Sequence, residues 1–227
     1  MLKFKYDISI VILNYNREKF LDRAIRSCAT QLLSGKSQEV IIIDDCSTDK
    51  SVEFLKKYNE VYKNDIKIFY NKKNMGIGYC SKLAVNLSQG KYFMRVDSDD
   101  FLNRNAVDIM ADILDFNQNY GFVYCDHYKT DEWGLKQKIV KLNKNNLLHH
   151  GAGILFRKNL IKKIGNYNPK LREAEDYDLI SRLNKICQPY YLPLPLYRYY
   201  MHEKNISKTG NRYNYIRKIK KNNEKKF

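Results

Sequence analysis

The chain has 227 residues with a formal net charge of +16, and hydrophobic residues make up 44% of it. This length suffices for one sizeable α/β domain with a substantial core and leaves little room for a second full domain. No apolar run reaches the roughly 20 residues that a membrane-spanning helix needs, and the polar residues 1–7 do not read as a signal peptide. The five cysteines form no CxxC pair, which argues against a disulfide framework and a structural zinc site and favours a reducing cytoplasm.

Strand patterns alternate with helix patterns in the first half of the chain. Continuous apolar runs at residues 8–13 and 40–43 suit strands buried on both faces, and shorter runs at 66–70 and 92–96 predict two more. A parallel sheet with right-handed crossovers follows, and ligands of such sheets collect at the carboxyl ends of the strands.

Helices are expected between these strands. Apolar residues at helical spacing predict a helix over residues 17–33 and another helical face over residues 80–87. The sheet-facing residues of the first helix are expected to be Leu21, Ile25, Cys28 and Leu32. A further helix is expected to begin after residue 49 and to carry Val52 and Leu55, because Ser47, Thr48 and Asp49 are residue types that cap helix N-termini.

Four polar residues directly follow the strand expected to end at residue 96. They are Asp97, Ser98, Asp99 and Asp100. Like charges at this density repel one another and are costly to bury, so a cation or a cationic partner is expected to rest there. Carboxylate oxygens suit Mg²⁺ or Mn²⁺, which usually keep positions open for phosphate oxygens. The sequence therefore predicts a metal-dependent phosphate site, with a solvated acidic turn that caps the next helix as the alternative.

A second acidic pair, Asp44 and Asp45, also stands at a strand end. A carboxylate accepts hydrogen bonds from an imide N–H or from ribose hydroxyls, whereas it repels phosphate unless a metal intervenes. The pair is expected to meet the base and sugar of a nucleotide, or only to cap the helix that follows.

Taken in order, these segments resemble the family 2 glycosyltransferases over roughly residues 8–207. The resemblance rests on the segments 9–17 (SIVILNYNR), 43–49 (IDDCSTD), 74–76 (NMG), 97–100 (DSDD), 165–167 (GNY) and 175–179 (EDYDL). Three departures are Leu13 where Pro is usual, Cys46 where Gly is usual, and Ser81-Lys82 where many members carry Arg-Asn.

The resemblance implies a single GT-A domain, which is an α/β, Rossmann-like fold with a mostly parallel central sheet flanked by helices. Residues 1–207 would form this domain, with a donor-nucleotide half at about 1–100 and an acceptor half at 101–207. Residues 208–227 would form a basic tail.

The resemblance implies an inverting, metal-dependent glycosyltransferase. It would move a sugar from a nucleoside-diphosphate sugar, expected to be a UDP-sugar, to a hydroxyl of a saccharide or lipid-linked saccharide. The setting expected by analogy is bacterial surface polysaccharide synthesis. Asp176 would be the catalytic base with Glu175 beside it, and Asp97, Asp99 and His202 would hold Mn²⁺ or Mg²⁺. The implied donor-binding residues are Leu13, Tyr15, Asn16, Arg17, Asp44, Asp45, Gly76, Lys82, Asp97 and Ser98. Without the upstream motifs, Glu175, Asp176 and Asp178 would read as first-turn acids favoured by the helix dipole.

Residues 201–227 hold nine Lys or Arg and two Glu, a net charge of +7. Residues 213–221 are expected to form a short basic helix on an anionic membrane leaflet, where each basic residue adds about 1 kcal/mol. Nucleic-acid binding and a merely solvated tail are the alternatives.

The middle of the chain gives weaker signals. Residues 126–148, which include His127, are expected to form variable loops and edge strands, with Trp133 packed in the core or stacked on a sugar ring. In the family, the segment of His149, His150 and Gly151 lines the acceptor and donor-sugar pocket. Two other classes of function stay open, a nucleotidyltransferase and a non-enzymatic basic module that binds nucleic acid, although no nucleic-acid partner is expected.

Overall fold

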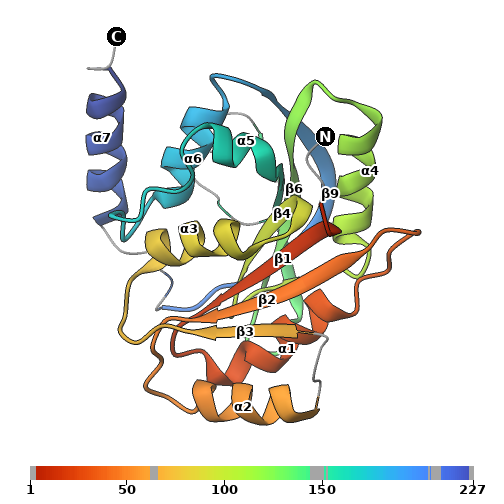
Figure 1. Ribbon diagram of the computed structural model, residues 1–227, viewed down its shortest axis with the longest axis vertical. Coiled ribbons are helices and arrows are strands. Elements are labelled where there is room, and N and C mark those ends of the chain that lie inside the picture. Colours follow the sequence, from red (N-terminus) through yellow and green to blue (C-terminus); the bar gives the residue numbers. More distant parts are fainter. Residues whose placement is uncertain are drawn as a thin grey trace.

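A computed structural model of the chain describes residues 4–61, 66–143, 151, 153–203, 205 and 211–224. Its first half alternates strands and helices (Figure 1). These elements are β1 (Tyr6–Asn14), α1 (Glu18–Ala29), β2 (Gln38–Asp44), α2 (Ser51–Val61), β3 (Ile66–Tyr70), α3 (Ile77–Leu87) and β4 (Gly90–Asp97). The four strands pair in parallel, with β1 between β2 and β4 and with β3 outside β2.

The second half extends the same sheet with strands of both directions. Its elements are β5 (Phe101–Leu102), α4 (Ala106–Phe116), β6 (Tyr120–Thr130), β7 (Lys136–Val140), β8 (Ile154–Arg157), α5 (Lys158–Lys163), α6 (Glu175–Leu183), β9 (Gln188–Tyr200) and α7 (Asn211–Glu224). The strand order is β3-β2-β1-β4-β8-β6-β9-β5, and β7 lies off this path and pairs antiparallel with β6. β8 runs antiparallel to β4 and β6, whereas β6 and β9 form a long parallel pair. The predicted α/β class with a mostly parallel sheet is confirmed.

Register brings the ends of three strands together. Leu13 at the end of β1 pairs with Ile43 of β2 on one side and with Asp97 of β4 on the other. The acidic segments that follow β2 and β4 therefore flank the end of β1 at one edge of the sheet, as the order of elements predicts.

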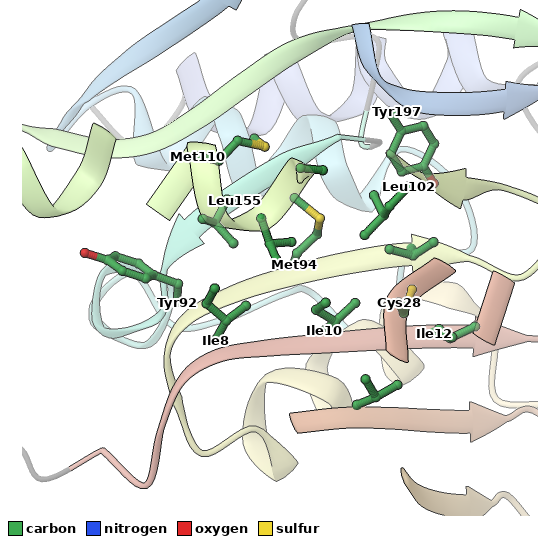
Figure 2. Close-up of a cluster of buried hydrophobic side chains, with 14 of the residues drawn as sticks. Ile8, Ile10, Ile12, Cys28, Tyr92, Met94, Leu102, Met110, Leu155 and Tyr197 are labelled. Carbon is green, nitrogen blue, oxygen red and sulfur yellow. The ribbon is translucent and has the colours of Figure 1, made fainter. Parts of the chain in front are cut away.

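Both faces of the sheet are covered, because β1 is buried on both sides. Ile8, Ile10 and Ile12 point to one face and pack with residues of α1, α2 and α4, and Figure 2 shows part of this cluster. Val11 points to the other face and packs with residues of α3, α5 and α6. Alternation with a period of two within an unbroken apolar run explains how one strand serves two cores.

Asp49 fixes the starts of two helices. Its Oδ1 accepts a hydrogen bond from the Ser51 N–H at 2.9 Å at the start of α2, and its Oδ2 accepts one from the Glu18 N–H at 3.1 Å at the start of α1. The predicted capping role is confirmed, and the same carboxylate joins two consecutive β-α units.

Two expectations about single side chains are wrong. The first helix ends at Ala29 rather than at residue 33, and Leu32 is 49% exposed, because the chain leaves the helix and the Leu32 N–H donates to the Arg104 carbonyl. Trp133 is 78% exposed rather than packed in the core, since it lies in the turn between β6 and β7, where Asp131 accepts its backbone N–H. The region 126–143 does form edge structure, with β7 paired on β6, while residues 144–150, including His149 and His150, lie outside the described residues.

The basic tail includes a docked helix. Ile216 and Ile219 of α7 are each 6% exposed and pack with Ala174 and Tyr177 at the start of α6. Within the described part of the chain, none of the helices has the length and apolarity needed to cross a membrane.

Candidate active site

The turn after β1 is tied to the turn after β2. Asn16 adopts a left-handed conformation with φ of 54°, which asparagine tolerates better than most residues. Its Oδ1 accepts the Thr48 N–H at 2.7 Å, while the Asn14 amide donates to Asp44 at 2.7 Å. These bonds hold Tyr15 and Arg17 at the strand edge.

Asp44 and Asp45 have different surroundings. Asp44 is fully buried, and its carboxylate accepts the Ser47 N–H at 2.9 Å and the Ser47 hydroxyl at 2.6 Å. Asp45 accepts the backbone N–H groups of Met75 and Gly76, both at 2.8 Å, so its carboxylate orders the loop before α3. Asp44 therefore holds its own turn together, whereas Asp45 stands at the edge of a cavity.

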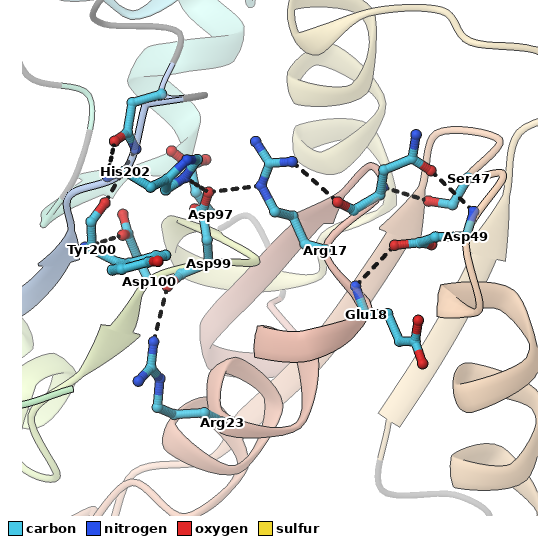
Figure 3. Close-up of polar contacts among 12 residues, drawn as sticks. Arg17, Glu18, Arg23, Ser47, Asp49, Asp97, Asp99, Asp100, Tyr200 and His202 are labelled. Atoms are coloured by element: carbon cyan, nitrogen blue, oxygen red, sulfur yellow. Dashed lines mark hydrogen bonds and ion pairs between the residues drawn. The ribbon is translucent and has the colours of Figure 1, made fainter. Parts of the chain in front are cut away.

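Asp99 is the centre of a charged cluster at the end of β4 (Figure 3). Its Oδ2 accepts the Arg17 Nε–H at 2.9 Å and lies 2.9 Å from His202 Nε2. Burial acts to raise the pKa of Asp99, but the hydrogen bonds with His202 and Arg17 outweigh it and the pKa is lowered. Asp99 is thus a carboxylate that its contacts with Arg17 and His202 already stabilise.

Asp100 has the opposite character. It is 1% exposed, and burial together with the neighbouring Asp99 and Asp97 raises its pKa well above the ordinary value. Its Oδ1 accepts the Tyr200 N–H at 2.9 Å, which attaches β9 to the acidic turn. Asp100 serves the structure of the turn rather than its ligand face.

The donor set at this turn fits a divalent ion bound together with a diphosphate. Among the described residues, no group of three or more His, Cys, Asp or Glu side chains is gathered as a metal site. Asp99 and His202 lie in contact, and a carboxylate with an imidazole suits Mn²⁺. Mg²⁺ and similar ions commonly use one or two protein ligands and take the rest from substrate phosphates and water. Asp97, which is also implicated, has Arg95 Nε 3.5 Å from its Oδ1.

The acidic pair Glu175 and Asp176 lies at the start of α6, after Ala174 in a left-handed conformation. Glu175 Oε1 accepts a hydrogen bond from Arg95 Nη1 at 2.6 Å, and both side chains are nearly inaccessible. Burial raises the pKa of Glu175, although Arg95 acts in the opposite direction. The pKa of Arg95 is also raised, because Asp97 and Glu175 together outweigh the effect of its burial.

Asp176 is held by its own helix and by α7. Its Oδ1 accepts the Tyr177 N–H at 2.7 Å, and Arg212 Nη2 lies 3.1 Å from Oδ1 and 3.2 Å from Oδ2. Gly151 lies against the same carboxylate, so closely that an added Cβ would stand 2.5 Å from Oδ2.

A cavity of about 770 Å³ joins the two acidic clusters. A volume in this range accommodates a cofactor-sized ligand. The site residues expected from the sequence that line it are Leu13, Tyr15, Arg17, Asp45, Gly76, Asp97, Ser98, Asp99, Glu175 and Asp176.

Four expected site residues are not among its lining. The side-chain oxygens of Asn16 and Asp44 accept hydrogen bonds within the turns after β1 and β2. His202 does not line the cavity but contacts Asp99, which does. Lys82 lies on α3 but does not line the cavity, so the structure gives no support for its contact with a diphosphate.

Three arginines of the cavity are absent from the residues expected from the sequence. They are Arg95, Arg172 and Arg212. Arg95 gives a signal that could have been read, since it is a charged residue inside an apolar strand. Arg172 donates to the Asn74 side chain at 2.7 Å across the loop before α3, and nothing local marks either Arg172 or Arg212.

Comparison with known proteins places the chain in a family. The sequence model described as glycosyl transferase family 2 matches residues 9–169. The chain belongs to this family. The matched range contains both acidic strand ends, and the motif at residues 175–179 lies just beyond it.

Relatives of this family member carry names of sugar transferases. It is 28% identical to the chondroitin synthase of Escherichia coli, over 88% of this chain and 30% of the relative, and 31% identical to the poly(ribitol-phosphate) β-N-acetylglucosaminyltransferase TarS of Staphylococcus aureus, over 78% and 31%. An uncharacterised glycosyltransferase of Haemophilus influenzae is 27% identical over 90% of this chain and 68% of its own. The chain thus spans about a third of the length of the first two relatives.

Solved structures share the fold. Residues 1–349 of S. aureus TarS in complex with UDP-GlcNAc superpose with a TM-score of 0.77 at 22% identity, covering 94% of this chain and 65% of that one. GalNAc-T7 with UDP, GalNAc and Mn²⁺ superposes with a TM-score of 0.74 at 14% identity, over 95% and 48%. The GT-A fold expected from the sequence is confirmed.

Proposed function

We propose that this family 2 member is an inverting, metal-dependent glycosyltransferase that moves a sugar from a UDP-sugar to a hydroxyl of a saccharide or glycolipid acceptor in bacterial surface polysaccharide synthesis. The observation that carries the proposal is one cavity that Asp45, Asp99 and Asp176 line together. Asp45 would face the nucleoside, Asp99 the diphosphate side, and Asp176 the acceptor. The relatives named for chondroitin and for poly(ribitol phosphate), and the neighbour solved with UDP-GlcNAc, support the class of donor and the setting.

Residues of this chain account for the step at the acceptor. Asp176 would take the proton from the acceptor hydroxyl as its oxygen attacks the anomeric carbon, and the bond from that carbon to the diphosphate oxygen would break on the opposite face. Such a displacement inverts the configuration. Asp99 and His202 would hold the divalent ion, which when bound offsets the negative charge of the leaving diphosphate. Arg17, 2.9 Å from Asp99, would add a second positive charge there.

The test is release of UDP. Purified protein is incubated with a panel of UDP-sugars and Mn²⁺, with and without saccharide acceptors, and UDP and inorganic pyrophosphate are both measured. Metal-dependent UDP release that Asp176→Asn removes, with UDP binding retained, supports the proposal. Pyrophosphate release would instead indicate a nucleotidyltransferase, and wild-type rates in Asp176→Asn would overturn the assignment of the base.

We also propose that the exposed face of α7 contacts anionic membrane. Arg217, Lys218 and Lys221 are exposed on this helix, opposite the face that packs on α6. Changing these three residues to Gln should weaken sedimentation with phosphatidylserine vesicles, since each basic residue near an anionic surface contributes about 1 kcal/mol. The matched control changes the exposed Lys56, Lys57 and Lys72 to Gln. Equal binding of the two triple variants would refute the membrane role.

A further inference from the structure

Helix α7 packs on the start of α6 through apolar side chains. Ile216 and Ile219 are buried against Ala174 and Tyr177. Burial of apolar side chains is favourable, so these two isoleucines hold the helix on α6 through apolar contact. The docking of α7 therefore fixes the position of the other side chains on its packing face relative to the cavity.

Arg212 stands on that packing face. It precedes Ile216 by four residues and Ile219 by seven, which places the three side chains on one side of a helix. Its side chain is 14% exposed, lines the cavity, and lies 3.1 and 3.2 Å from the two carboxylate oxygens of Asp176, which is itself 8% exposed.

The other charged groups around Asp176 are committed elsewhere. Arg95 on β4 acts on Asp176 at longer range, but its guanidinium is held by Glu175 at 2.6 Å. Asp97 on β4 and Glu175 on α6 are acids that repel the Asp176 charge, and Tyr167 is a further titratable neighbour among the described residues. Arg212 thus supplies the direct positive partner of a carboxylate that lies among other carboxylates.

The arrangement leaves Asp176 able to accept a further hydrogen bond. One nitrogen of Arg212 bridges the two oxygens, the Tyr177 N–H takes a second position on Oδ1, and each carboxylate oxygen has two lone-pair sites. Asp176 also lines the cavity, so the carboxylate borders open space on that side. A hydroxyl approaching from the cavity can therefore still reach the carboxylate while Arg212 holds it.

We propose that Arg212 is the positioning residue of the base, so that α7 completes the active site by holding the Asp176 carboxylate in one orientation. This inference rests on the proposed function of Asp176. It assigns to the docked face of the basic tail a role in transfer that is separate from any role of its exposed face.

The experiment compares Arg212→Ala and Arg212→Lys with the wild type, using the UDP-sugar that the wild type turns over fastest in the presence of Mn²⁺. In Arg212→Ala, kcat should fall about tenfold or more while the Kd of UDP stays within about twofold. Arg212→Lys should keep part of the rate.

Two further variants test whether the effect depends on the docked position of α7 rather than on the charge of the helix or on loss of folding. Lys220→Ala, at an exposed position of α7, should match the wild type, whereas Ile216→Asp, which removes the apolar contact, should reproduce Arg212→Ala. Melting curves of all variants establish that they are folded. A wild-type rate in Arg212→Ala, or a loss of UDP affinity as large as the loss of rate, overturns the inference while the wild type still transfers sugar. Absence of turnover by the wild type on every donor would instead overturn the proposed function and this inference with it.

Discussion

Arg95 and Glu175 form a buried ion pair that joins β4 to the start of α6, 80 positions later in the chain. Arg95 Nη1 lies 2.6 Å from Glu175 Oε1, and the two side chains are 6% and 4% exposed. Arg95 also donates to the Ser81 hydroxyl at 3.0 Å, so α3 joins the same network. The pair connects the donor half of the cavity with the helix that carries the proposed base.

Removing one partner of this pair should be costly. Arg95→Met should lower the free energy of unfolding by about 3–5 kcal/mol, because it leaves Glu175 buried without a counter-charge. Urea denaturation monitored by circular dichroism measures the change. Lys57→Met is the matched control, since its partner Glu53 is at 2.8 Å but the two side chains are 73% and 60% exposed. It should leave the free energy of unfolding close to that of the wild type, because water screens an exposed ion pair. Equal costs in the two variants would contradict the importance of burial here.

Asp99→Asn should remove metal-dependent binding of UDP. The amide keeps the shape of the side chain but has lost the negative charge that would hold a divalent ion next to His202. Calorimetric titration of UDP with Mn²⁺, and again after EDTA, measures the effect: the wild type should lose affinity when the metal is removed, and the variant should bind equally weakly in both conditions. The control is Asp22→Asn, because Asp22 is a carboxylate that pairs with Arg26 on the surface of α1. This variant should behave as the wild type. Metal-dependent binding that survives in Asp99→Asn would contradict this prediction.

Local patterns made much of this architecture predictable. An apolar run followed by acids marks a buried strand and its end, and parallel strands place such ends at one edge, so the convergence of Asp45 and Asp99 on one cavity follows from order alone. The division between Asp44 and Asp45 does not follow, because it depends on which carboxylate the Ser47 turn captures.

Contacts between side chains far apart in the sequence could not be predicted from local patterns. Arg212 meets Asp176 only because α7 docks through Ile216, and the charge pattern of the tail describes its exposed face, not the contacts of its other side. Trp133 was misplaced for a similar reason, since whether an aromatic residue is buried depends on which edge of the sheet its hairpin extends.

Gly151→Ala should slow transfer without weakening donor binding. An added Cβ would lie 2.5 Å from Asp176 Oδ2 and 2.7 Å from its Cβ, so the proposed base or the loop must shift. Small displacements of a catalytic group cost rate steeply, and a fall in kcat of about 10²-fold is expected. Because Asp45 and Asp99 are untouched, the Kd of UDP should stay within about twofold. Kinetics and titration of the same preparation measure the two quantities, and loss of UDP binding alongside kcat would mean that the loop also shapes the donor side.

Lys158 predicts a dependence of stability on pH that lies outside the active site. Its ammonium donates to the Ser88 carbonyl at 2.6 Å at the end of α3, and burial, with a smaller contribution from Lys162, lowers its pKa from 10.5 to about 8. Below pH 8 the lysine is charged in both states, and the folded protein bears the cost of burying that charge. Between pH 8 and 10.5 the folded state releases the proton before the unfolded state does, so stability due to this group rises with pH.

The comparison of wild type with Lys158→Met isolates this group, because other groups that titrate in the same range affect both proteins alike. The free energy of unfolding of the wild type should increase relative to that of Lys158→Met when urea denaturation is repeated at pH 7 and pH 10. A Lys56→Met control, at an exposed position, should keep a constant difference from the wild type across the two pH values. If the Lys158→Met difference is also constant, the lysine titrates with its ordinary pKa in the folded protein, and burial near α3 is offset by the carbonyl that accepts its hydrogen bond.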